Sequence, residues 1–193
     1  MTRYLKEKAK EIKLERGRGK DPKALADEGE ITQMRGVCGK LNWASRMAMP
    51  QGSGDASILS GTMPNPTIQD LSDANAALRR LIQNDVPIII QPIPLDELRL
   101  LTFTDASHGN AAGGAAQVGH LICATHNSIY KGESAMVSLL TFTSHKNDRA
   151  APSTLLNEAT AYSATLANAE WAASWIGICC LLYTSPSPRD YPG

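Results

Sequence analysis

Two acidic residues in the C-terminal half of the sequence stand where a metal-dependent nuclease would need them. Asp105 lies at the end of an apolar, strand-like segment, and Glu158 lies in the first turns of a predicted long helix. Glu158 shares one side of that helix with Leu155 and Tyr162, at offsets of three and four residues. A helix packed on the strands by that side would direct Glu158 at the sheet. Converging carboxylates need a cation, and magnesium prefers such oxygens, so we predict a magnesium site at Asp105 and Glu158.

The chemistry that such a site would perform is phosphodiester cleavage. Two magnesium ions roughly 3.5–4 Å apart can activate a water and stabilise the leaving oxygen. The two acids alone are a weak signal for this reaction. Asp105 could simply form a turn, and Glu158 could simply interact with the helix dipole in the first turn of its helix. At this point both interpretations stay open.

Three strand-like segments are predicted to carry Asp105 and its neighbours. Side chains alternate in character over residues 98–107, 116–125 and 137–144. The first two segments are joined by a turn at residues 108–114, which is rich in glycine and asparagine. The order of strand, turn and strand predicts an antiparallel meander.

A long helix is predicted to follow the strands and to carry Glu158. Ser153 or Thr154 can cap its start, and the helical pattern continues to about residue 176. An apolar stripe on this helix is predicted to face the sheet. The stripe consists of Leu155, Ala159, Tyr162, Leu166, Ala169 and Ala173.

The N-terminal part of the chain, residues 1–86, reads as a helical region. Apolar residues recur every three or four positions over residues 30–47, until prolines and glycines at 50–54 interrupt the pattern. A second helix is predicted over residues 67–83, capped by the threonine at its start. Residues 87–97 predict an extended linker to the strands. The fold class expected for the whole chain is therefore α+β.

An ordered series of short motifs resembles the ribonuclease H domain of copia-type retrotransposons. In chain order the motifs are Thr104-Asp105-Ala106-Ser107, Gly119-His120-Leu121-Ile122, Ser144-His145-Lys146, and Ser153-Thr154 followed by Glu158. Residues 34–43 resemble the segment after the polymerase palm in these polyproteins. Residues 66–81 resemble the helix before the ribonuclease H domain, and the likeness covers about residues 4–177. The resemblance implies a piece of a Pol polyprotein, from the end of its reverse transcriptase into its ribonuclease H domain.

The same resemblance implies a site of four acids and two magnesium ions that cleaves the RNA strand of RNA–DNA hybrids. Asp105 matches the first acid and Glu158 the second. The third and fourth acids follow the long helix in the family, and Asp190 matches neither. Ser107 and Lys146 are expected to contact nucleic acid, although Lys146 could equally be solvated. The chain itself is therefore expected to be inactive or nearly so, with the remainder of the Pol polyprotein as its partner.

The predicted domain organisation has four parts. Residues 1–86 form the helical connection region, 87–97 the linker, and 98–177 the incomplete ribonuclease H-like domain. Residues 178–193 contain prolines without a helical or strand period. Residues 181–190 look like a translated sequencing-library adapter, so this tail is expected to be disordered and non-native.

A run of basic residues near the N-terminus supports an alternative, non-catalytic interpretation. Its members are Arg3, Lys6, Lys8, Lys10, Lys13, Arg16, Arg18, Lys20 and Lys23, in a chain whose formal net charge is +0. Such a run can bind phosphates. The interleaved Glu7, Glu11 and Glu15 instead favour a solvated helix face. A module that binds nucleic acid or a protein partner stays open, as does an unrelated small interaction domain.

The remaining residue types predict structural roles. The four cysteines form no CxxC pair, which indicates a reduced intracellular protein, cytoplasmic or nuclear. His120 and His126 are predicted to be hydrogen-bonded or exposed, and not metal ligands. Trp43, Trp171 and Trp175 are predicted to be core residues and not platforms for stacked bases. The charged start of the sequence predicts no signal peptide, and no apolar run reaches the length of a membrane span.

Overall fold

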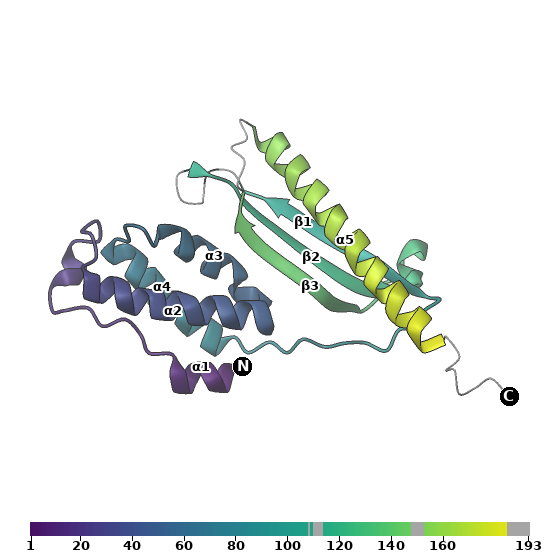
Figure 1. Cartoon of the computed structure of the whole chain (residues 1–193), viewed down its shortest axis with the longest axis horizontal. Coiled ribbons are helices and arrows are strands. Elements are labelled where there is room, and N and C mark those ends of the chain that lie inside the picture. The colour runs from purple at the N-terminus through teal and green to yellow at the C-terminus, as the bar shows by residue number, and fades with distance from the viewer. Residues whose placement is uncertain (108, 110–113, 148–152, 185–193) are drawn as a thin grey trace.

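The computed structural model describes residues 1–107, 109, 114–147 and 153–184, with side chains described as far as Cys179. A group of helices stands beside a three-stranded sheet, and a long helix crosses one face of that sheet (Figure 1). The helices are α1 (Thr2–Lys8), α2 (Glu28–Met47), α3 (Ser53–Thr62), α4 (Ile68–Gln83) and α5 (Thr154–Thr184). The strands are β1 (Leu98–Ala106), β2 (Gln117–His126) and β3 (Val137–Lys146), and short 3-10 turns cover Arg18–Lys20, Pro50–Gly52 and Asn127–Lys131. The predicted α+β class is confirmed.

The start of α2 is fixed by polar contacts. The Asp27 side chain accepts a hydrogen bond from the backbone of Glu30, and the Glu30 side chain accepts one from the backbone of Asp27. Glu30 is only 4% exposed, and the Arg18 guanidinium donates to its carboxylate at 2.5 Å. That hydrogen bond lowers the pKa of Glu30 from its usual value, against the opposing effect of burial. The reciprocal cap explains why α2 begins slightly before the predicted residue 30.

The core of the helical region forms mainly between α2 and α4. A second reciprocal cap, between Thr67 and Asp70, starts α4 where the sequence predicts. Apolar residues from α2, α3 and α4 then pack together with Leu5 of α1. The most deeply buried members include Leu5, Met34, Leu41, Ala44, Leu71, Ala74 and Leu78. The predicted helical periodicity of both α2 and α4 is confirmed by this burial.

The segment after α1 is extended because α4 binds its backbone. Asn75 is buried on α4; its side-chain oxygen accepts from the Ile12 N–H at 2.7 Å, and its amide donates to the Ile12 carbonyl at 3.0 Å. These two bonds satisfy backbone groups that a longer helix would have satisfied internally. The mixed-charge sequence around residues 4–16 is therefore helical only as far as Lys8.

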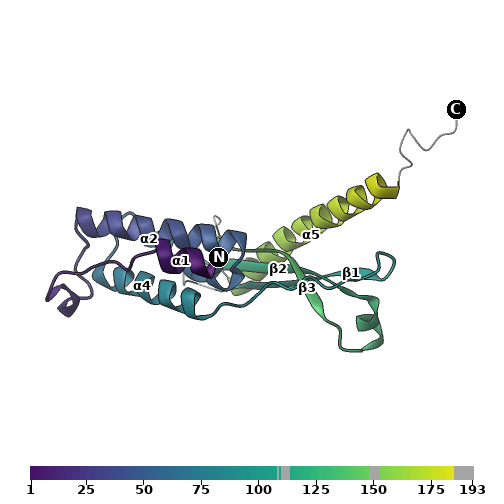
Figure 2. The ribbon, with the colours of Figure 1, turned by 90° about the horizontal axis from the view of Figure 1, so that it is seen from below.

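The three strands pair in sequence order, β1-β2-β3, and all pairings are antiparallel. Ala106 pairs with Val118, and Gly119 pairs with Ser144. A register shift between Ile122 and Cys123 interrupts the second ladder. The meander predicted from the alternating segments is confirmed. The helix α5 lies across β1 and β2, and Figure 2 shows it diverging from the plane of the sheet toward its C-terminal end.

The prediction of which side of α5 faces the sheet is wrong. Leu155 is 79% exposed, Tyr162 60% and Leu166 48%. The buried residues of α5 are small or polar instead: Asn157, Ala161, Thr165 and Ala172.

Close packing and local hydrogen bonds explain why α5 packs on the sheet by the side that carries these small and polar residues. Ala161 is fully buried and packs against Ala106 and Val118 of the sheet. The Thr165 hydroxyl donates to the Ala161 carbonyl at 2.8 Å, and the Asn157 amide oxygen accepts from Asn147 at 3.2 Å. Small side chains let the helix approach the strands, and the buried polar groups have partners, so their burial is not penalised.

The helix α5 also extends beyond its predicted end near residue 176 and continues to Thr184. Part of the segment predicted to be a disordered tail is therefore helical. Residues 185–193, which include Asp190, lie outside the described residues, as does most of the predicted turn at 108–114. In the part of the chain that the structure describes, no helix combines the length and apolar character needed to cross a lipid bilayer.

The tryptophans are not core residues, and their predicted burial is wrong. Trp43 is 46% exposed, Trp171 61% and Trp175 50%. Trp43 instead packs against Tyr4 of α1, with ring centroids 4.8 Å apart. Trp171 and Trp175 meet edge to face on α5, with centroids 5.8 Å apart. Each tryptophan therefore pairs with another aromatic ring on the surface.

Candidate functional site

Asp105 lies on the face of the sheet that α5 does not cover. The next residue, Ala106, packs against Ala161 of α5. Neighbouring side chains in a strand point to opposite faces, so Asp105 projects away from α5. It is exposed and lines a hollow of about 280 Å³ between the sheet and the start of α3, together with Phe103 and Ser53.

Glu158 lies at the same end of the sheet but on the other face. It is half-buried on α5, one turn before Ala161, which contacts Ala106. The predicted convergence required α5 to pack by its Leu155 side, and that side is exposed. The structure therefore brings both acids to one end of the sheet while directing them from opposite faces.

The acidic side chains that the structure describes do not by themselves form a two-magnesium site. Such a site needs several carboxylates around two ions roughly 3.5–4 Å apart. Among the described residues, no group of three or more Asp, Glu, His or Cys side chains could hold a metal ion. No catalytic step can be derived from Asp105 and Glu158 as they stand.

The two predicted nucleic-acid contacts have different surroundings. The Ser107 hydroxyl donates to the Gln117 carbonyl at 3.3 Å and accepts from the Gln117 N–H at 3.2 Å. These bonds close the β1–β2 end of the sheet, so Ser107 has a structural role there. Lys146, at the end of β3, is exposed and makes no salt bridge with any described residue.

The two histidines of β2 also differ. His126 contacts the Glu97 carboxylate and accepts a hydrogen bond from the Ser128 N–H at 3.1 Å, as expected for a hydrogen-bonded residue. His120 is buried, and its Nδ1 has no hydrogen-bond partner within the described residues, so the prediction is wrong for it. Burial, and then the nearby His145, lower the pKa of His120 from its usual value. His120 is therefore neutral at neutral pH.

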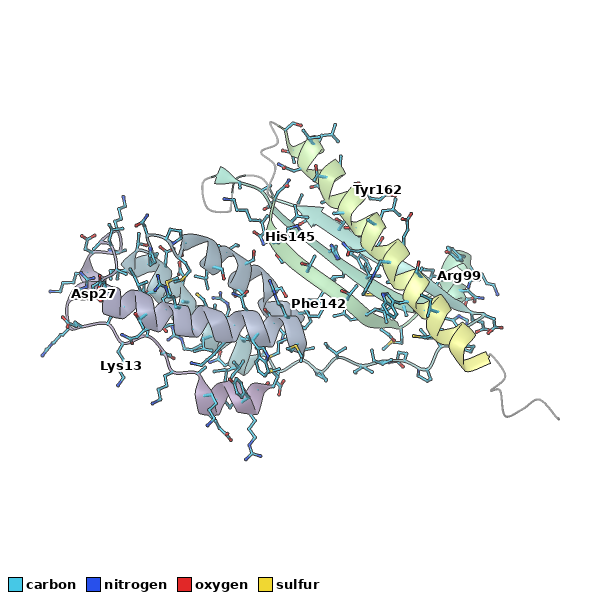
Figure 3. All side chains as sticks on the ribbon, viewed as in Figure 1. Lys13, Asp27, Arg99, Phe142, His145 and Tyr162 are labelled. Atoms are coloured by element: carbon cyan, nitrogen blue, oxygen red, sulfur yellow. The ribbon has the colours of Figure 1, made fainter. Side chains whose placement is uncertain are left out.

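A polar cleft between the helical region and β3 was not predicted from the sequence. It encloses about 540 Å³, and the lining residues that the structure describes include no acidic side chain. Figure 3 labels Phe142 and His145 along β3, the strand nearest the helical region. The lining residues are Asn42, Ser45, Arg46, Ser53, Ser57, Ser60, Phe142, Thr143, Ser144 and His145.

One sequence signal could have indicated half of this cleft. Ser53, Ser57 and Ser60 follow each other at steps of four and three residues, which places their hydroxyls on one side of a helix. The signal requires residues 53–62 to be helical, whereas the local glycines and the proline predict an interruption. The other half, on β3, is joined to it only by the tertiary fold.

Two acids lie at one end of the sheet, and a cleft rich in hydroxyl groups opens between α2, α3 and β3. Comparison with protein-family models, curated proteins and solved structures found no match.

Proposed function

We propose that the chain belongs to a copia-type retrotransposon polyprotein, where it joins the end of the reverse transcriptase to the first part of ribonuclease H. In this proposal the chain binds RNA–DNA hybrid and does not cleave it. The ordered motif series supports the family, and the observed order of β1, β2, β3 and α5 is compatible with it. The observation that carries the non-catalytic part is the placement of Asp105 and Glu158 on opposite faces of the sheet. A magnesium site in the intact parent would need both the remaining acids of the polyprotein and a packing of α5 that brings Glu158 toward Asp105.

Local positive charge supports binding to nucleic acid. Lys6, Lys8 and Lys10 are exposed and form no salt bridge with any residue the structure describes. Lys10 also lines a hollow of about 260 Å³ along α2 with Lys13 and Lys40. Because the net charge of the chain is +0, attraction to phosphates must come from such a local patch and not from the whole molecule.

Nearby acids neutralise other cations of the same region. Arg3 pairs with Glu7 at 2.9 Å, and Arg79 pairs with Glu11 at 2.7 Å. Lys6, Lys8 and Lys10 thus remain unpaired with acids among the described residues, and they can displace counterions from a nucleic-acid backbone. A purely solvated surface would not give salt-dependent binding.

A labelled RNA–DNA hybrid tests both parts of the proposal. We expect binding that persists in EDTA, weakens with salt, and falls when Lys6, Lys8 and Lys10 are changed together to glutamine. The matched control is Arg3→Gln with Glu7→Gln, which removes a neutralised pair and leaves the net charge unchanged. With magnesium added, we expect no cleavage above background.

Two outcomes would contradict the proposal. Robust cleavage that is lost in Asp105→Asn would overturn the non-catalytic part. Absence of hybrid binding at low salt, in a chain shown to be folded by circular dichroism, would overturn the binding part.

A further inference from the structure

We infer that the cleft between α2, α3 and β3 binds a phosphate group of a nucleic-acid backbone, with Arg46 as the charged contact. The inference rests on the proposed function and assigns it a specific site, separate from Asp105 and from the N-terminal lysines. It follows from which donors in the cleft already have partners and which do not.

Arg46 brings an uncompensated positive charge to the cleft. It is exposed near the end of α2 and makes no salt bridge with any described residue. Asp55 on α3 is engaged by Arg80 at 2.9 Å, and none of the described residues that line the cleft is acidic. A guanidinium presents several N–H donors in one plane, a geometry that matches two oxygens of a phosphate. An anion is therefore the ligand that this cleft favours.

Internal hydrogen bonds hold one wall of the cleft in place. The Ser45 hydroxyl donates to the Asn42 carbonyl at 3.1 Å, and the Asn42 amide donates to the Ser60 hydroxyl at 2.7 Å. Ser60 in turn donates to the Ala56 carbonyl at 2.6 Å. These groups fix α2 against α3, so the cleft does not need to be organised by its ligand.

Other hydroxyls in the cleft still have protons to donate. Ser53 and Ser57 make no side-chain hydrogen bond within the part of the chain described here. Ser144 on β3 accepts from the Gln117 amide at 2.8 Å, which leaves its own O–H available. Three hydroxyls and one guanidinium, with no carboxylate among the described lining residues, form a donor set suited to a singly charged phosphodiester.

The volume of the cleft is compatible with this ligand. About 540 Å³ lies within the range of sites that hold small molecules, so a phosphate with its sugar can enter. The same donors would accept a free phosphate or a mononucleotide. The experiment must therefore compare these sources.

The test measures binding of the full chain to a labelled RNA–DNA hybrid across a salt series. We expect Arg46→Ala to weaken binding about tenfold and to lower the slope of log affinity against log salt by about one. Arg46→Lys should keep the slope but recover only part of the affinity, because an ammonium lacks the planar fork. Ser57→Asp should weaken binding at least as much as Arg46→Ala, since it places a carboxylate in the cleft.

The matched control is Arg35→Ala on the same helix. Arg35 is exposed, makes no salt bridge with a described residue, and lies on the side of α2 that carries Arg46, about 16 Å away along the axis. We expect its replacement to leave affinity within about twofold, because it removes a charge without touching the cleft. Equal losses in Arg35→Ala and Arg46→Ala would overturn the inference.

The remaining outcomes separate the inference from the proposed function. Tight hybrid binding that Arg46→Ala does not change would overturn the cleft site and leave the proposed function standing. No hybrid binding, together with calorimetric binding of inorganic phosphate or a mononucleotide that Arg46→Ala abolishes, would overturn the proposed function and support the cleft as a phosphate site. Binding of none of these probes would overturn both. If Ser57→Asp fails to fold, the exposed Arg46 variants decide.

Discussion

The helical region and the sheet region of this chain differ in how they bury apolar side chains. In the helical region, α2, α3 and α4 share one extended core, which Leu5 of α1 also joins. In the sheet region, the corresponding cluster consists of Ala106, Val118 and Ala161. Large side chains of the sheet region remain exposed, including Phe103, Leu121, Leu155, Tyr162, Leu166, Trp171 and Trp175. Ile122, Cys123 and Ala124 of β2 are also buried. We nevertheless expect the helical region to contribute the larger share of the free energy of folding, since buried apolar area is its main source.

The largest expected contrast comes from truncating one leucine in each region. Leu78→Ala, at a core position 1% exposed, should lower the free energy of unfolding by about 2–5 kcal/mol because it leaves a cavity. Leu166→Ala, on the exposed side of α5, should change it by less than about 0.5 kcal/mol. Urea unfolding followed by circular dichroism measures both. If Leu166→Ala lowered the free energy of unfolding as much as Leu78→Ala, the exposed side of α5 would have to be buried against another surface in solution.

Cysteine labelling compares the same regions without a destabilising mutation. Burial raises the pKa of Cys38 on α2 to about 11 and also raises the pKa of Cys123 on β2. Both thiols are therefore protonated at pH 8 and react only when their region opens. We expect Cys123 to react roughly tenfold faster than Cys38, and the exposed Cys179 fastest. Faster reaction of Cys38 than of Cys123 would mean that the helical region opens more readily than the sheet region, contrary to our expectation.

A smaller effect is expected at the helix caps. Asp27→Ala removes the reciprocal cap of α2 and should cost about 1 kcal/mol. At the start of α5, the exposed Ser153 accepts from the Leu156 N–H at 3.2 Å, and Ser153→Ala should cost about 0.5 kcal/mol or less. Thermal unfolding of the two variants checks the order. A larger loss of stability in Ser153→Ala than in Asp27→Ala would mean that α5 contributes more to stability than its packing indicates.

The smallest expected effect is a dependence of stability on pH that belongs to the helical region. The hydrogen bond from Arg18 lowers the pKa of Glu30 in the folded chain. Its contribution is therefore complete above the unfolded pKa of about 4.3 and is lost as the pH falls through the folded value. Unfolding midpoints measured between pH 6 and pH 3 should decline less in Glu30→Gln than in the natural sequence. Equal declines would show that Glu30 does not contribute to the pH dependence of stability.

The sequence predicted the position of most helices and strands. The apolar repeats of α2 and α4 match the burial of those helices, whereas β1, β2 and β3 lie where predicted but do not alternate in burial. The orientation of α5 could not be predicted in this way. Large apolar residues mark one side of that helix, but Asn157 and Thr165 are buried on another because they find hydrogen-bond partners there.

The candidate sites show the same limit. Asp105 and Glu158 were recognisable as residues, yet their positions on opposite faces arise because α5 covers the face of the sheet that carries Ala106. The complete cleft was not recognisable, because Arg46 and Ser144 come to line it together only through the packing of α3 against β3. Tertiary contacts between distant segments leave no period in the sequence.

The most direct test of the central claim uses one labelled RNA–DNA hybrid, incubated with the full chain and resolved on native and denaturing gels. The native gel, run with EDTA, should show a complex that weakens as salt rises. The denaturing gel, after incubation with magnesium, should show intact RNA. Magnesium-dependent cleavage that disappears in Asp105→Asn, or the absence of any complex at low salt, would contradict a chain that binds the hybrid without cleaving it.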